Sequence, residues 1–167
     1  MGPAFAAVGA GVAALLESTI VSRYHIAGAQ LQMSLVLAVA VTLVYGFEEG
    51  MAWAFVGGLC LDFFGMRPLG STVFELLIAV ALTTLAEPLL SRSRFLGCVT
   101  AVFVVSPVIL ILSDVTTALL ATSAPPLHLS SLVAGAVANA LVAAVLVPLV
   151  IGLKRRAEQR ERVLWWR

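Results

Sequence analysis

The chain has 167 residues, of which 61% are hydrophobic and 11% are charged, and its formal net charge at pH 7 is +1. This share of charged residues is too small to cover the surface of a water-soluble domain of this length. The composition therefore excludes a soluble globular protein and indicates a chain whose solvent is largely lipid.

Charged residues, glycines and prolines divide the sequence into six apolar segments. A helix needs about 20 apolar residues to cross a hydrocarbon core of roughly 30 Å. The segments are continuously apolar, without the alternation of a transmembrane strand, so only helices can satisfy their backbone in lipid. The sequence predicts an all-α, polytopic membrane protein with six transmembrane helices. The predicted helices cover residues 3–22, 28–46, 50–66, 70–87, 96–119 and 128–153.

The connections between these segments are short, so consecutive helices are expected to be antiparallel neighbours in one transmembrane domain, residues 1–153. Residues 154–167, "KRRAEQRERVLWWR", are expected to form a basic cytoplasmic tail. With the N-terminus inside, eight Lys and Arg residues fall on the inner side (two in the fourth connection, six in the tail) and two on the outer side. Positively charged loops stay in the cytoplasm, so both termini are predicted to be cytoplasmic.

Four carboxylates fall in the outer part of the membrane once this topology is set: Glu17, Asp62, Glu75 and Asp114. An ionised side chain at membrane depth costs about 2.5 to 3.5 kcal/mol on insertion scales, so each is expected to face protein, water or a partner. Three interpretations remain open: contacts at helix ends near headgroup water, a polar docking surface for another protein, and the floor of an outward-facing ligand pocket. A proton relay is disfavoured because the acids do not continue through the inner half.

Small residues recur every four positions on three segments. Each stripe winds around its helix, because a step of four residues overshoots a helical turn of 3.6 residues. Small residues allow helices to approach closely in lipid, so we expect packing within the chain more than recruitment of an outside helix. The stripe on the third predicted helix ends in Asp62, which suggests that this carboxylate points into protein. The stripes are Gly2, Ala6, Ala10, Ala14, Ser18 and Ser22; Gly46, Gly50, Ala54, Gly58 and Asp62; and Ala136, Ala140 and Ala144.

The sequence "MRPLG" is expected to reverse the chain between the third and fourth helices. Arg67 precedes a proline and is therefore disfavoured in helical geometry, Pro68 starts the turn, and Gly70 permits an unusual backbone conformation. We expect the Asp62 carboxylate to fix this corner. Its expected partners are Arg67, the backbone amides of the turn, or a residue near Arg23.

Sequence motifs for catalysis are absent: there is no Walker loop and no nucleophile elbow. Cys60, Cys98, His25 and His128 do not have the spacing of a zinc site. We therefore expect no enzymatic activity, no metal and no cofactor. For the basic tail, attraction to anionic lipid or to a cytosolic partner is a more economical interpretation than nucleic-acid binding.

Two stretches, "LLESTIVSRYHIAG" and "GFEEGMAWAFVGGLCLDFFGMRPLG", resemble MreD, the rod shape-determining membrane protein family of bacteria. The family commonly has Gly-Leu-x-x-Asp followed by Pro-Leu-Gly, which here is Gly58 to Asp62 and then Pro68 to Gly70. Helix number, short loops and a basic C-terminus also match. The chain departs from the family pattern at Leu31-Gln32, where Pro-Asp is frequent, and at Phe64-Gly65, where Ser or Thr is frequent.

The resemblance implies a non-enzymatic scaffold of the peptidoglycan elongation machinery in the bacterial inner membrane. It implies binding to the transmembrane helix and juxtamembrane region of MreC. It also implies an indirect association with RodA, its transpeptidase and MreB. Homodimerisation within that complex is left open. The expected structural or interaction residues are Glu17, Gly58, Asp62, Arg67, Pro68, Gly70, Glu75 and Asp114.

MreD is also similar to the S-components of energy-coupling-factor vitamin transporters, so the resemblance implies an S-component-like bundle. The alternative function is therefore a substrate-binding S-component, which would dock its transporter through small-residue faces such as Ala6, Ala10 and Ala14. The outer loops are short and poor in residues that enclose a ligand, which favours the scaffold.

Overall fold

The computed structural model describes residues 3–19, 25–26, 29–65, 68–90, 93–120 and 129–164. Its regular structure is almost entirely helical, which confirms the predicted all-α class. The α-helices follow the predicted apolar segments in order: α1 Pro3–Thr19, α2 Met33–Tyr45, α3 Phe47–Phe64, α4 Ser71–Ala86, α5 Arg94–Leu120 and α6 Leu129–Leu164. The connections contain two short strands, β1 His25–Ile26 and β2 Ala29–Gln30, which pair antiparallel, and a 3-10 turn, η2 Glu87–Leu89.

Three helical stretches in the described part of the chain are long and apolar enough to cross a membrane: Ser71–Leu89, Arg94–Ala118 and Ser130–Ala157. The other helices are shorter or more polar. Helix α2 has 13 residues, about 20 Å at 1.5 Å per residue, and α3 includes Glu48, Glu49 and Asp62. The structure thus supports a membrane protein with three candidate spans in its described residues, and it does not confirm the predicted count of six.

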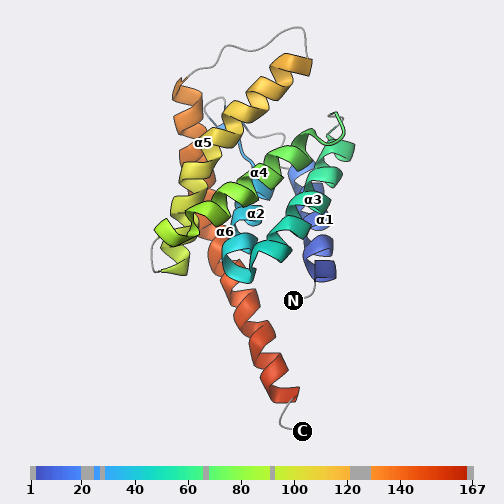
Figure 1. Cartoon of the computed structure of the whole chain (residues 1–167), viewed down its shortest axis with the longest axis vertical. Helices are drawn as coiled ribbons and strands as arrows, with labels where there is room; N and C mark the ends of the chain where they lie inside the picture. Colours follow the sequence, from blue (N-terminus) through green and yellow to red (C-terminus); the bar gives the residue numbers. More distant parts are fainter. Residues whose placement is uncertain are drawn as a thin grey trace.

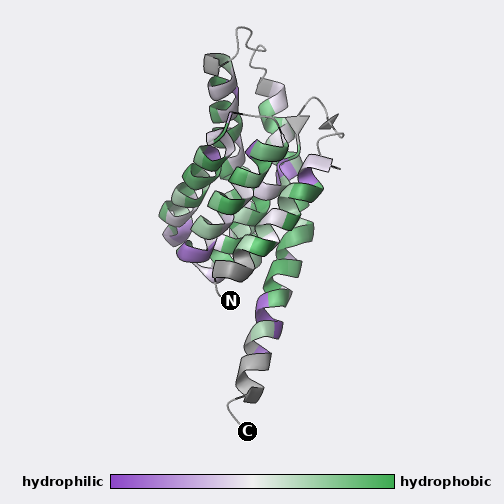
Figure 2. Cartoon of the chain, turned by 90° about the vertical axis from the view of Figure 1, so that its right-hand side faces the viewer, coloured by the Kyte–Doolittle hydropathy of each residue, from purple (hydrophilic) through white to green (hydrophobic). Residues whose placement is uncertain are grey.

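Helix α2 is the centre of the bundle, where it contacts each of the other five α-helices (Figure 1). Almost all of its side chains are buried, and Val36 and Val39 are completely inaccessible. A helix that is apolar on every side belongs either in a core or in lipid. The surrounding helices instead expose large apolar side chains, including Phe55, Phe63 and Leu141. Figure 2 shows that hydrophobic residues predominate along the helices of the bundle, as expected of helices that pack together in lipid.

Helix α1 begins and α6 ends at the same end of the bundle (Figure 1). We call this the inner end and the opposite one the outer end. Helix α6 has 36 residues, about 54 Å, so its last part projects beyond the other helices. It continues from Lys154 to Leu164 without interruption, so the predicted boundary at residue 154 is a change of polarity and not of secondary structure. Lys, Arg, Glu, Gln and Ala are all good helix formers, which explains the continuity.

The second helix begins later than predicted, at Met33 instead of residue 28. Ala29–Gln30 pairs with His25–Ile26, so these residues belong to the connection. Side chains of other helices then accept hydrogen bonds from the amides of Gln32 and Ser34, which fixes the start of α2.

Small residues of α3 pack against different neighbours on successive turns, which confirms packing within the chain for this stripe. A Cβ atom at Gly50 would collide with the Thr42 side chain of α2. A Cβ atom at Gly58 would lie 2.6 Å from the Cα atom of Val73 in α4. The stripe winds around α3 as expected, so one repeat serves two interfaces.

Candidate functional site

The Asp62 carboxylate closes the corner between α3 and α4. Its side chain is only 1% exposed. One oxygen accepts a hydrogen bond from the Gly70 amide at 2.7 Å, and the other accepts one from the Thr72 amide at 2.9 Å. The Ser71 hydroxyl lies 3.2 Å from this second oxygen. These groups are at the start of α4, so Asp62 caps that helix from the preceding one and its negative charge faces the positive end of the helix dipole.

Gly58 lies one turn before Asp62 and brings the backbones of α3 and α4 into direct contact. The position of its missing Cβ is only 2.8 Å from the Val73 nitrogen as well as 2.6 Å from its Cα atom. No real side chain tolerates such approaches to backbone atoms without a shift of one helix. Gly58 therefore sets the distance between the helices, and Asp62 fixes their ends.

The turn residues complete this corner. Gly70 has a φ of 96°, in the left-handed region that glycine adopts without strain. The Pro68 carbonyl accepts a hydrogen bond from the Ser71 amide at 3.1 Å. Arg67 and Arg23, the arginines named with the expected partners, lie outside the described residues. The expected contact with the turn amides is confirmed by the hydrogen bond from Gly70.

Glu17 makes a comparable link between α1 and α2. Its side chain is half-buried, and one carboxylate oxygen accepts a hydrogen bond from the Ser34 amide at 2.6 Å. Ser34 is in the first turn of α2, where backbone amides have no partner within the helix. Glu17 thus supplies an acceptor and a favourable charge to a helix start that has little access to water.

Glu75 links α4 to α5. It is 3% exposed, and the Thr116 hydroxyl donates a hydrogen bond to its Oε1 at 3.2 Å. Asp114, two residues before Thr116, is partly exposed and makes no hydrogen bond or ion pair with another described residue. Within the described ranges, no three His, Cys, Asp or Glu side chains gather closely enough to hold a metal ion. Glu17, Asp62 and Glu75 therefore act at three separate helix contacts instead of as one cluster, and Asp114 takes part in none of them.

Asn139 is a central polar residue that the sequence analysis missed. It is completely buried on α6, where its Oδ1 accepts a hydrogen bond from the Gln32 amide at 3.1 Å and its Nδ2 donates to the Ser106 hydroxyl at 3.0 Å. It thereby joins the start of α2 to the middle of α5. A lone asparagine in the apolar run "VAGAVANALVAAV" is the signal that could have identified it.

Lys154 acts at the opposite end of α2. Its ammonium group donates to the Val44 carbonyl and lies 5.5 Å from the centre of the Tyr45 ring. The carbonyls in the last turn of a helix receive no hydrogen bond from the helix itself, and the negative end of the helix dipole attracts a cation. Helix α2 is thus held at its start by Glu17 and Asn139 and at its end by Lys154.

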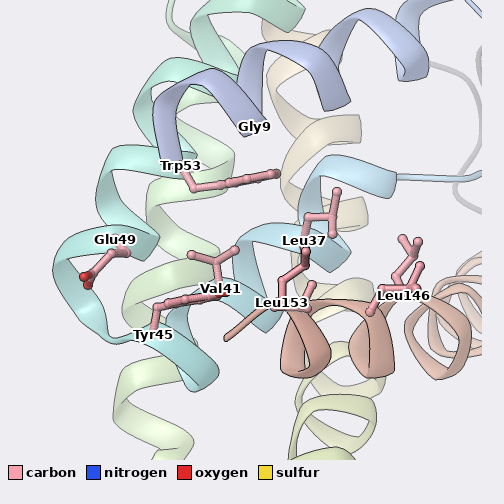
Figure 3. Close-up of a pocket in the computed structure, with 10 residues that line it drawn as sticks. Gly9, Leu37, Val41, Tyr45, Glu49, Trp53, Leu146 and Leu153 are labelled. Carbon is pink, nitrogen blue, oxygen red and sulfur yellow. The ribbon is translucent and has the colours of Figure 1, made fainter. Parts of the chain in front are cut away.

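An apolar pocket of about 220 Å³ lies between α1, α2, α3 and α6 at the inner end. Figure 3 shows the Trp53 ring against the turn of α1 that carries Gly9, with Leu37 and Val41 on the α2 side. The indole nitrogen of Trp53 is buried without a hydrogen-bond partner among the described groups. None of the four outer acids is among its lining residues, so it is not the outward-facing pocket with an acidic floor that the sequence left open.

No family model matches the chain, and no curated protein or solved structure matches it either. In the described structure, the carboxylates of Glu17, Asp62 and Glu75 each connect neighbouring helices of the same chain.

Proposed function

We propose that this chain is an integral membrane scaffold of the bacterial cell-elongation machinery that binds the single-pass protein MreC. The observation that carries the proposal is the Asp62 corner. The residues on which the resemblance to MreD rests, from Gly58 to Gly70, form one packed unit between α3 and α4. A rigid corner at the membrane surface suits a protein that presents a fixed shape to others.

The use of the buried acids favours a scaffold over a solute carrier. Asp62, Glu75 and Glu17 each direct a carboxylate oxygen to a donor on a neighbouring helix. A carrier that binds a polar solute needs such groups to converge on the solute. Here they stabilise the bundle instead.

In the proposed arrangement all six helices cross the bacterial inner membrane and both termini are cytoplasmic. Helix α2 is short, but side chains of α1 and α6 hydrogen-bond to its two ends. Helix α3 carries acids, and one of them, Asp62, is satisfied by backbone amides at the start of α4. Non-lipid-exposed polar groups are tolerated at membrane depth when protein satisfies them. MreC engages the chain from within the membrane, while RodA, its transpeptidase and MreB work with it indirectly.

Depletion of the chain in its own host tests this function. We expect rod-shaped cells to become round, and the wild-type chain supplied from a plasmid to restore the rods. The Asp114→Asn variant, which loses no observed contact, serves as the control and should also restore them. Rods that persist after depletion, together with a loss of uptake of one vitamin, would instead support the S-component function.

A further inference from the structure

A basic pocket of about 380 Å³ lies at the inner end of the bundle, between the start of α5, the end of α2 and the late part of α6. It is distinct from the apolar pocket beside Trp53. Arg94, Lys154 and Arg155 supply three positive charges, and Ser93 adds a hydroxyl. The remaining lining residues in the described chain are apolar: Val44, Phe95 and Ile151.

The two arginines are available to an incoming anion. Lys154 is already engaged with the Val44 carbonyl and the Tyr45 ring. Arg94 and Arg155 are exposed, and neither makes a hydrogen bond or ion pair with another described residue. Two guanidinium groups beside one cavity are well suited to a phosphate, because each presents a planar fork of donors.

The start of α5 strengthens the attraction for an anion. This helix has 27 residues and begins at Arg94, so the pocket contains the positive end of its dipole. The amides of Leu96 and Gly97 already have acceptors in Ser93, so the helix start contributes the charge of its dipole and not these two donors. The helix start and both arginines therefore favour the same charge.

The position of the pocket identifies the kind of phosphate. Arg94 begins one candidate membrane span, Arg94–Ala118, and Arg155 lies near the end of another, Ser130–Ala157. Both cations thus lie near the ends of candidate spans, where a membrane would change from hydrocarbon to headgroups, and apolar side chains line the same pocket. A lipid phosphate with its glycerol matches this pairing of cations and apolar residues. Basic pockets between transmembrane helices on the cytoplasmic side are a known form of lipid recognition.

We propose that this pocket binds the phosphate of an anionic phospholipid from the inner leaflet, through Arg94 and Arg155. The inference does not depend on the proposed role in cell elongation. It assigns to the chain a defined headgroup site, in addition to the general attraction between its basic helix extension and the membrane.

Thermal unfolding of the purified full-length chain in detergent tests the proposal. Phosphatidylglycerol is expected to raise the melting temperature of the wild type more than phosphatidylcholine does. Arg155→Gln and Arg94→Gln should each remove most of that difference. Arg156→Gln is the matched control: it changes the same charge at the next position, but Arg156 does not line the pocket, so the difference should persist.

Two results would overturn the proposed lipid site. Equal loss in Arg155→Gln and Arg156→Gln would show that the lipid responds to the general charge of the helix, and would overturn the site. Stabilisation by glycerol phosphate as large as that by phosphatidylglycerol would identify a site for a soluble anion and overturn the lipid assignment. Arg94 and Arg155 make no contact that holds the fold, so the variants without added lipid should melt as the wild type does.

Discussion

The carboxylate of Asp62 in α3 accepts a hydrogen bond of 2.9 Å from the backbone amide of Thr72 in α4, and the Asp62 side chain is almost completely buried. A residue in the last turn of α3 thereby caps the start of α4. Since lipid provides little hydrophobic force between helices, such polar contacts and close packing have to hold the bundle together.

Replacement of Asp62 by alanine is expected to destabilise the chain. It leaves the amides of Gly70 and Thr72 without their acceptor, and loss of hydrogen bonds to a buried charged group should lower the free energy of unfolding by about 2 to 4 kcal/mol. Asp114→Ala removes the same group at a partly exposed position and should change little. Melting temperatures in detergent measure both, and equal values for the two variants would contradict the capping role.

Replacement of Gly58 by alanine is expected to force α3 and α4 apart. The added methyl would lie 2.6 Å from the Val73 Cα atom, and overpacking of this kind costs about 1 to 3 kcal/mol. The neighbouring Gly57→Ala is the control, because its Cβ would meet Ala10 Cβ at an ordinary 3.5 Å. Alanine also favours a helix over glycine, so Gly57→Ala should be neutral or slightly stabilising. A Gly58→Ala variant as stable as Gly57→Ala would refute the close approach.

Replacement of Asn139 by leucine is expected to destabilise the centre of the bundle. The change leaves the Gln32 amide and the Ser106 hydroxyl without their partner, at about 1 to 3 kcal/mol for a buried unsatisfied group. Adding Ser106→Ala should cost less in the Asn139→Leu background than in the wild type, since the shared hydrogen bond is already lost. Strictly additive losses in urea unfolding would argue against this contact.

Cysteine labelling tests whether α3 crosses the membrane. In a variant without Cys60 and Cys98, single cysteines at the exposed positions Glu48 and Leu69 lie near opposite ends of α3. A membrane-impermeant thiol reagent added to intact cells should label the cysteine at position 69 and not the one at position 48. Labelling of both from outside would show that α3 does not span, and would contradict the arrangement with six transmembrane helices.

The sequence predicted the helical fold well, because continuous apolar runs in lipid allow few alternatives to helices. It also predicted that Asp62 faces protein, since this residue continues a stripe of small residues and precedes a glycine-containing turn. Both inferences depend on local features: composition, periodicity and turn residues.

The contacts of α2 could not be predicted in the same way. The bond between Asn139 and the Gln32 amide joins positions 107 residues apart, and it depends on which faces of α2 and α6 meet. The sequence indicates only that Lys154 begins the basic tail. Its contact with the last turn of α2 arises because α6 passes that end of α2 in the folded chain. The tertiary arrangement also places the outer acids at different helix contacts. The topology predicted from sequence gave their common depth in the membrane but not the residues that each of them contacts.

Whether the chain is a scaffold for cell elongation is tested most directly by what remains bound to it in its native membrane. The tagged full-length chain would be extracted from its own host with mild detergent, and the co-purifying proteins and small molecules identified by mass spectrometry. The proposed function predicts MreC in near-stoichiometric amount, and less of it with Asp62→Ala than with Asp114→Ala. Recovery of a transporter's ATPase subunits together with a bound vitamin, and no MreC, would contradict it.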